Sequence, residues 1–141
     1  CFARMSSTEA TESPAEVEKK LGNDAFAKKD FEKAIEHYNA AIKLDDSKAT
    51  YYSNLSACYA SLKKWEEAMD AALNCVSKDN KFVKGYLRLA AAQTELKLYD
   101  DAEKTLRAAL VLEPRTCPLS IWSLHFNKHY SWIHLLPSSL N

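Results

Sequence analysis

The sequence predicts an all-α fold built from three consecutive pairs of antiparallel helices. Glycine and proline are scarce, with two and four copies in 141 residues, while 47% of the residues are hydrophobic and 27% are charged. This composition is typical of a soluble helical protein with short connections. The chain also aligns with itself when it is shifted by 34 residues, which brings Leu21 onto Leu55 and Leu55 onto Leu89. A repeat of this length indicates stacked helix pairs.

Small and aromatic residues recur at fixed positions of the repeat. A small residue follows each leucine, at Gly22, Ser56 and Ala90. Further along each copy comes an aromatic residue that we expect in the core: Phe31, Trp65 and Tyr99. The same register joins Cys75 to Ala41 and Ala109, which predicts a small buried residue there. Three copies result, over residues 15–48, 49–82 and 83–116.

Each copy divides into two helical halves. In the second copy, the spacing of Tyr52, Leu55, Ser56 and Tyr59 fits one face of a helix. Polar breaks that contain lysine, at residues 28–30, 63–64 and 97, separate this half from a second amphipathic run. The spacing therefore predicts two helices per copy and six in all.

Local signals predict where the array begins and ends. Ser13 is a good N-cap, Pro14 suits the first helical position, and Glu16 completes a capping box. Pro114 ends the third copy, because proline cannot continue a helix.

A helix–turn–helix unit of 34 residues with this residue pattern resembles the tetratricopeptide repeat. The resemblance covers residues 15–116 and implies a right-handed α-solenoid of three tetratricopeptide repeats, followed by an irregular C-terminal tail. It also implies that the first helix of each copy lines a concave groove. Positions 4, 7, 8 and 11 of each copy carry its core residues, so positions 2, 5, 6 and 9, about 200° around the helix, are expected to face the groove.

The groove positions carry a set of donors that suits an anion. They include Lys19 and Asn23 in the first copy, Asn54 in the second, and Lys84 and Arg88 in the third. Lysine supplies compact charge, arginine a planar fork, and asparagine amides donate without a counter-charge. A chain-terminal acidic residue carries two carboxylates and would satisfy several of these donors. Small residues, Ala57, Ala60 and Ala91, would form the groove floor.

These five residues are also similar, position by position, to the dicarboxylate clamp of co-chaperone tetratricopeptide domains. Lys19 and Asn23 match KxxxN, Asn54 matches YSN, and Lys84 and Arg88 match KGYxR. The family resemblance extends to the Hsp70–Hsp90 organising co-chaperones. It implies an adaptor that binds the Glu-Glu-Val-Asp tails of heat-shock protein 70, heat-shock protein 90 or both, with no cofactor and no catalytic residue.

Other interpretations stay open at this point. The repeats could belong to a larger clamp-containing protein, such as an immunophilin, a phosphatase, a ubiquitin ligase or an organelle import receptor. They could also be a structural scaffold without a peptide ligand, its lysines being ordinary surface charges. An enzyme is not expected, because the predicted groove holds no base beside a nucleophile.

Both glycines lie inside predicted first helices. We expect Gly22 to permit close helix packing, and Gly85 to reflect a tight contact, since glycine costs about 1 kcal/mol of helix propensity relative to alanine.

The two ends of the chain differ from the middle. Residues 1–14 are expected to be disordered, with Met5 as the true start. The tail 117–141 is atypical and is interpreted as non-native coding sequence, or alternatively as an unusual cap or a hydrophobic docking segment. The tail places Cys117 near His125, His129 and His134, but it contains no acidic residue and its cysteine spacing is irregular, so no metal site is expected.

Bulk charge excludes some classes of partner. Nineteen basic residues balance nineteen acidic ones, which gives no support to nucleic-acid or membrane-surface binding. No apolar run reaches the roughly 18 residues of a membrane span. The four cysteines, Cys1, Cys58, Cys75 and Cys117, form no CxxC pair and are expected to be reduced. We therefore expect a monomeric cytoplasmic protein.

Overall fold

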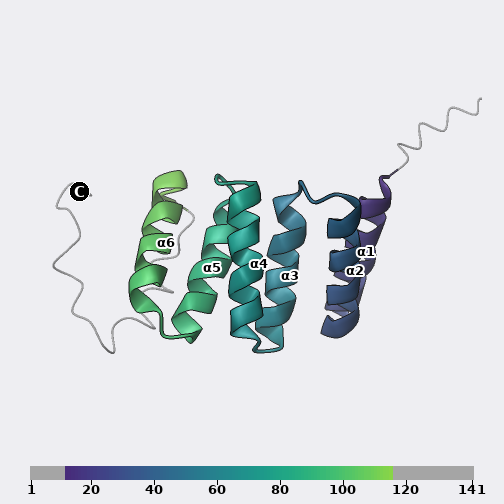
Figure 1. Cartoon of the computed structure of the whole chain (residues 1–141), viewed down its shortest axis with the longest axis horizontal. Coiled ribbons are helices and arrows are strands. Elements are labelled where there is room, and N and C mark those ends of the chain that lie inside the picture. Colours follow the sequence, from purple (N-terminus) through teal and green to yellow (C-terminus); the bar gives the residue numbers. More distant parts are fainter. Residues whose placement is uncertain (1–11, 116–141) are drawn as a thin grey trace, which may run out of the picture.

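The computed structural model describes residues 12–115 and contains six α-helices and no strand in that range (Figure 1). The helices are α1 (Pro14–Ala27), α2 (Phe31–Leu44), α3 (Ala49–Ser61), α4 (Trp65–Lys78), α5 (Val83–Glu95) and α6 (Tyr99–Leu112). The predicted all-α solenoid of three helix pairs is thus confirmed. The expectations for residues 1–11 and 116–141, including the start at Met5, the atypical tail and the histidine group, lie outside the described residues.

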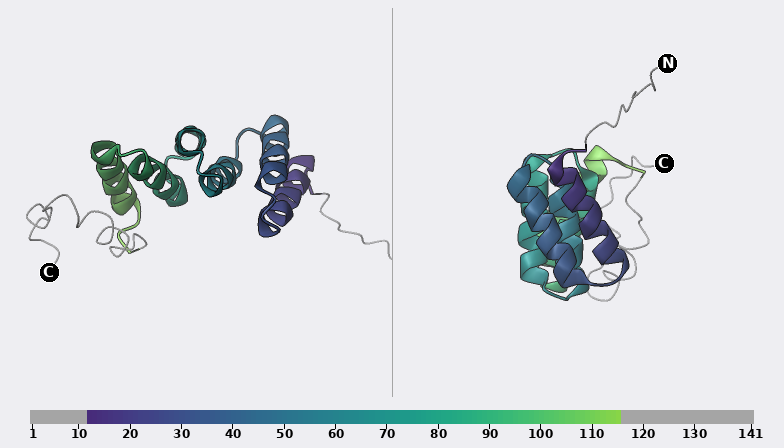
Figure 2. Two further views of the ribbon diagram at one scale, coloured as in Figure 1. Left: turned by 90° about the horizontal axis from the view of Figure 1, so that it is seen from below. Right: turned by 90° about the vertical axis from the view of Figure 1, so that its right-hand side faces the viewer.

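The helices are arranged in two rows. Figure 2 shows α1, α3 and α5 on one side and α2, α4 and α6 on the other. Each helix packs against its neighbours in the chain, and α3 also contacts α5 across the first row. This nearest-neighbour packing is characteristic of a solenoid, in which the core is continuous from one repeat to the next. The first helices therefore share one face of the molecule.

The first helix begins where its capping residues predict. The Ser13 side chain accepts a hydrogen bond from the backbone N–H of Glu16 at 3.3 Å, and Pro14 is the first helical residue. The predicted capping box is only half formed, however. The Glu16 carboxylate bonds to Lys19 and to the Tyr51 hydroxyl instead of reaching back to the cap. The local sequence predicts that Glu16 caps the helix end, but in the structure its carboxylate bonds to other side chains.

The first helix of every pair ends in the same left-handed turn. Lys29, Lys63 and Lys97 have φ values of 62°, 59° and 63°. In the first repeat, the N–H of Lys29 donates to the carbonyl of Phe26 and the N–H of Asp30 to that of Ala25, both at 2.9 Å. These two bonds form a Schellman motif, which satisfies carbonyls that the helix end leaves free. Lysine at this position costs about 1 kcal/mol relative to glycine, because its Cβ crowds the backbone.

This turn predicts a stabilising substitution. Lys29→Gly should raise the free energy of unfolding by about 0.5–1 kcal/mol, since glycine adopts positive φ without steric cost. The matched control is the adjacent Lys28→Gly, where φ is −81° and glycine should be neutral or destabilising. Urea denaturation followed by circular dichroism measures both. Equal effects of the two substitutions would contradict the role of the left-handed turn.

The core consists of large residues from one helix set against small residues of the next. Tyr38, Tyr51, Cys58 and Cys75 are fully buried. One cluster joins all of the first two helix pairs, with Ala25, Ala34, Tyr38, Leu55, Cys58 and Ala71 as its buried members. Cys75 is buried as predicted, and it and Cys58 are free thiols. Burial raises the pKa of each of these two thiols to about 11.

Two residues that the repeat pattern assigns to the core are exposed, because they lie at the ends of the array. Leu21 is 43% exposed, whereas the equivalent Leu55 and Leu89 are 7% and 5% exposed. Tyr99 is 36% exposed, whereas Phe31 and Trp65 are partly buried. No repeat precedes α1 or follows α6 within residues 12–115, so their outer faces lack the neighbour that buries the inner copies. The core prediction is therefore wrong for Leu21 and Tyr99.

Both glycines mark places where two helices touch. A Cβ on Gly22 would lie 2.7 Å from the ring carbon Cε1 of Tyr38 in α2. A Cβ on Gly85 would lie 2.9 Å from the Sγ of Cys75 and 3.1 Å from the Cγ2 of Val76, both in α4. The predicted packing role of Gly22 and the predicted tight contact at Gly85 are confirmed. Gly22 allows α1 to pack closely against α2 within the first repeat, and Gly85 allows α5 to pack closely against α4 of the preceding repeat.

The contact at Gly85 predicts a coupled pair of substitutions. Gly85→Ala should cost a net of about 1 kcal/mol, because overpacking of roughly 1–3 kcal/mol exceeds the gain in helix propensity. In a Cys75→Ala background the sulfur is absent and the same glycine substitution should cost less. A double-mutant cycle in urea measures the difference, and simple additivity of the two effects would show that the contact is not limiting.

Candidate functional site

The five predicted clamp residues all lie on the row of first helices. Lys19 and Asn23 come from α1, Asn54 from α3, and Lys84 and Arg88 from α5. Asn54 Nδ2 donates to Asn23 Oδ1 at 3.3 Å, which joins the first two helices of the row directly. Arg88 lies close enough to Cys58 of α3 that its charge favours the thiolate, although burial dominates the pKa of this thiol. The fold thus aligns residues that are up to 69 positions apart in the sequence.

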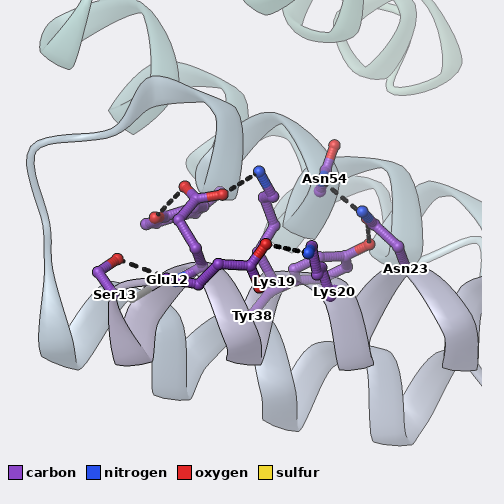
Figure 3. Close-up of polar contacts among 9 residues, drawn as sticks. Glu12, Ser13, Lys19, Lys20, Asn23, Tyr38 and Asn54 are labelled. Atoms are coloured by element: carbon purple, nitrogen blue, oxygen red, sulfur yellow. Dashed lines mark hydrogen bonds and ion pairs between the residues drawn. The ribbon is translucent and has the colours of Figure 1, made fainter. Parts of the chain in front are cut away.

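Asn23 is held in place from the second row. The Tyr38 hydroxyl donates to Asn23 Oδ1 at 2.7 Å, so this one oxygen accepts from both Tyr38 and Asn54 (Figure 3). Tyr38 is itself buried, and burial raises its pKa to about 12, so the hydroxyl remains a donor at neutral pH. The bonds at Oδ1 leave the Nδ2 group of Asn23 as the donor that an external anion could use.

The two lysines of α1 are paired with carboxylates. Lys19 Nζ bonds to Glu16, and Lys20 Nζ bonds to Glu12 (Figure 3). Glu16 also accepts a hydrogen bond from the Tyr51 hydroxyl at 2.8 Å, which ties it to α3. Lys19 and then Tyr51 lower the pKa of Glu16, so this carboxylate is ionised at neutral pH. The positive charge of α1 is therefore neutralised within the molecule.

The two cations of α5 are in a different situation. Lys84 and Arg88 are exposed and four residues apart on one helix. Within residues 12–115, neither forms an ion pair or a hydrogen bond to a side chain. Two cations at this spacing repel each other by a few tenths of a kcal/mol. The α5 end of the row thus carries the positive charge that is available to an anion.

The predicted floor residues differ in exposure. Ala57 is buried, Ala60 is partly buried and Ala91 is exposed. Ser53, at another predicted groove position, is also buried. Contact of the three alanines with a ligand stays a prediction.

The described residues offer little for other chemistry. Among residues 12–115, no three histidine, cysteine, aspartate or glutamate side chains are placed to hold a metal ion. None of the helices in this part of the chain has the length and apolar character needed to cross a membrane. The chemistry that the first-helix row can perform is the donation of charged and neutral hydrogen bonds.

Comparison with known proteins supports this geometry. A family model described as a TPR repeat matches residues 22–62. The solved TPR domain of Arabidopsis OM64 superposes with a TM-score of 0.77 at 36% identity, over 82% of this chain and 96% of that domain. The chain belongs to the tetratricopeptide-repeat family. The tetratricopeptide interpretation of the sequence is confirmed.

Two further proteins show which branch of the tetratricopeptide family is similar. The Hsp70-Hsp90 organizing protein of Triticum aestivum is 38% identical over 100 residues, which is 71% of this chain and 17% of the wheat protein. The second TPR domain of Spaghetti (RPAP3), solved with the HSP90 peptide SRMEEVD, superposes with a TM-score of 0.68 at 30% identity, over 70% of this chain and 92% of that domain. The chain therefore spans about a sixth of the length of the curated relative.

The sequence alone did not identify the residues that hold the predicted clamp side chains in place. Tyr38 occupies a core position, and its register partners Ala72 and Leu106 carry no hydroxyl, so the repeat pattern gives no sign of its bond to Asn23. Glu16 occupies position 2 of its repeat, one of the predicted groove positions, but the repeat pattern does not predict its bonds to Lys19 and Tyr51. The spacing of three residues between Glu16 and Lys19 is the one signal that could have suggested an ion pair.

The Tyr38–Asn23 bond predicts a measurable contribution to stability. Tyr38→Phe should lower the free energy of unfolding by about 1 kcal/mol, because the hydrogen bond from the buried Tyr38 side chain to Asn23 Oδ1 is lost. The control is Tyr59→Phe, a partly buried tyrosine whose hydroxyl has no partner within residues 12–115, and a change below about 0.5 kcal/mol is expected there. Urea denaturation of both variants is the measurement. A Tyr38→Phe variant as stable as the wild type would contradict the role of this bond.

Proposed function

We propose that the three repeats form an adaptor module that binds the acidic C-terminal tails of heat-shock protein 70 or heat-shock protein 90. Lys19, Asn23, Asn54, Lys84 and Arg88 act as the carboxylate clamp. The observation that carries the proposal is the pair Lys84 and Arg88, which has no ion-pair partner within residues 12–115 and shares a row of helices with the Asn23–Asn54 amide pair. The relatives support it, since one is an organizing protein of both chaperones and another was solved with an acidic HSP90 peptide.

The proposed mechanism is binding without chemical change. A terminal aspartate carries two carboxylates, and Lys84 and Arg88 lose their mutual repulsion when an anion lies between them. Neutral amides from Asn23 and Asn54 add donors without a desolvated counter-charge. We also propose that residues 15–116 act as one monomeric domain, that it is not an enzyme, and that it functions in the cytoplasm.

A second candidate is a docking module within a larger protein of the clamp type, such as an immunophilin, a phosphatase, a ubiquitin ligase or an organelle import receptor. The observation behind it is that the chain spans only 17% of the length of the wheat relative. A catalytic domain encoded in the same full-length transcript would support this candidate, and a transcript that encodes only repeats would oppose it.

Titration with the peptide Ser-Arg-Met-Glu-Glu-Val-Asp tests the proposed clamp. Amidation of the peptide C-terminus should weaken binding by about tenfold or more, since it removes one charge-assisted contact worth roughly 1.5–3 kcal/mol when desolvated. Lys84→Ala and Arg88→Ala should each weaken binding by a similar factor. Isothermal titration calorimetry at two salt concentrations measures these changes, and affinity should fall as salt rises.

The matched control for the clamp is Lys104→Ala, which removes one positive charge from an exposed position of α6 in the other row of helices. Its effect on affinity should be less than twofold. Unchanged affinity after peptide amidation or Lys84→Ala would contradict the clamp. A loss with Lys104→Ala equal to that with Lys84→Ala would show that binding depends on overall charge alone.

A further inference from the structure

Glu16 is an acidic side chain on the row of helices that carries the clamp. It occupies the second position of its repeat, where the later copies have Thr50 and Lys84. The second position of the repeat is therefore acidic in α1, neutral in α3 and basic in α5. Glu16 bonds to Lys19, the one lysine of the proposed clamp that comes from α1.

This carboxylate is anchored rather than loosely paired. The Tyr51 hydroxyl donates to Glu16 Oε1 at 2.8 Å, and Tyr51 is completely buried in α3. The other carboxylate oxygen of Glu16, Oε2, accepts a hydrogen bond from Lys19 Nζ. The side chains of Glu16 and Lys19 are 35% and 25% exposed, so water screens the pair only in part. Glu16 thus has one fixed partner on each side and remains beside the ammonium group of Lys19.

Occupation of Lys19 by Glu16 has a consequence for any anionic ligand. We propose that Glu16 is a specificity-determining residue that competes with the ligand carboxylate for Lys19 and so weakens the clamp. This inference rests on the proposed function, because it assumes that a carboxylate binds at Lys19. The lowered pKa of Glu16 is consistent with it, since the competing group stays ionised wherever the ligand is ionised.

The physical basis of the competition is charge repulsion. An ammonium group has three donors, so Lys19 can contact Glu16 and a ligand together. The two carboxylates then lie on either side of one cation and repel each other across a partly exposed site. A ligand with two carboxylates on its last residue meets more of this repulsion than a ligand with one. Removing the charge of Glu16 should therefore favour a terminal aspartate more than a terminal asparagine.

The test is Glu16→Gln, which keeps an acceptor for Tyr51 and Lys19 but removes the charge. Binding of Ser-Arg-Met-Glu-Glu-Val-Asp should become about three- to tenfold tighter at low salt, with a steeper loss of affinity as salt rises. The matching peptide that ends in asparagine should gain less. Glu16→Thr, which inserts the residue of the equivalent position in the second repeat, should give the same tightening if the effect is one of charge.

Glu36→Gln is the matched control, because it removes one negative charge from an exposed position of α2 in the other row of helices. Its affinity should match that of the wild type. Unchanged or weaker binding by Glu16→Gln, with amidation-sensitive binding by the wild type, would overturn this inference and leave the proposed function standing. Weaker binding in particular would show that Glu16 positions Lys19 instead of competing for it. An absence of amidation-sensitive binding by the wild type would overturn both proposals.

Discussion

Close approach of neighbouring helices at small residues is the constraint on which this structure depends. Gly22 leaves room for the Tyr38 ring, and Gly85 leaves room for the sulfur of Cys75. Ser56, which occupies the position of Gly22 in the middle repeat, is buried and donates to the carbonyl of Ala68 at 2.8 Å. These contacts determine how closely the helices involved pack against each other. Because the helix pairs stack one after another, the first helices form one row and bring distant donors onto one face (Figure 2).

The same packing also produces a division of charge along that face. At the α1 end, Lys19 and Lys20 are neutralised by Glu16 and Glu12. At the α5 end, Lys84 and Arg88 are exposed and lack such partners within residues 12–115. A net charge of zero for the whole chain therefore conceals a local positive field at one end of the row. Bulk composition excludes some partners, but the charge of individual side chains at defined places decides which anion is favoured.

The position of Asn23 shows how the two rows of helices cooperate. Its side chain lies on the first row, but its orientation depends on the hydroxyl of Tyr38, which belongs to the second row and to the core. A residue of the proposed clamp is thereby held by the packing that stabilises the fold. The Glu16–Tyr51 bond has the same character, since a buried tyrosine of α3 holds a partly exposed acid of α1. Hydrogen bonds from buried hydroxyls thus link the proposed clamp to the stability of the fold.

The sequence by itself determined the repeat, the six helices, the buried small residue at Cys75 and the row on which the donors lie, because these follow from a strict period and from helical geometry. Only the tertiary structure decided that Leu21 and Tyr99 are exposed, since each lies on an end helix that lacks a further repeat in the described chain. It also decided the hydrogen bonds from Tyr51 to Glu16 and from Tyr38 to Asn23. A repeat pattern specifies which way a side chain faces, whereas its partner depends on residues 15 to 35 positions away that only packing brings within bonding distance.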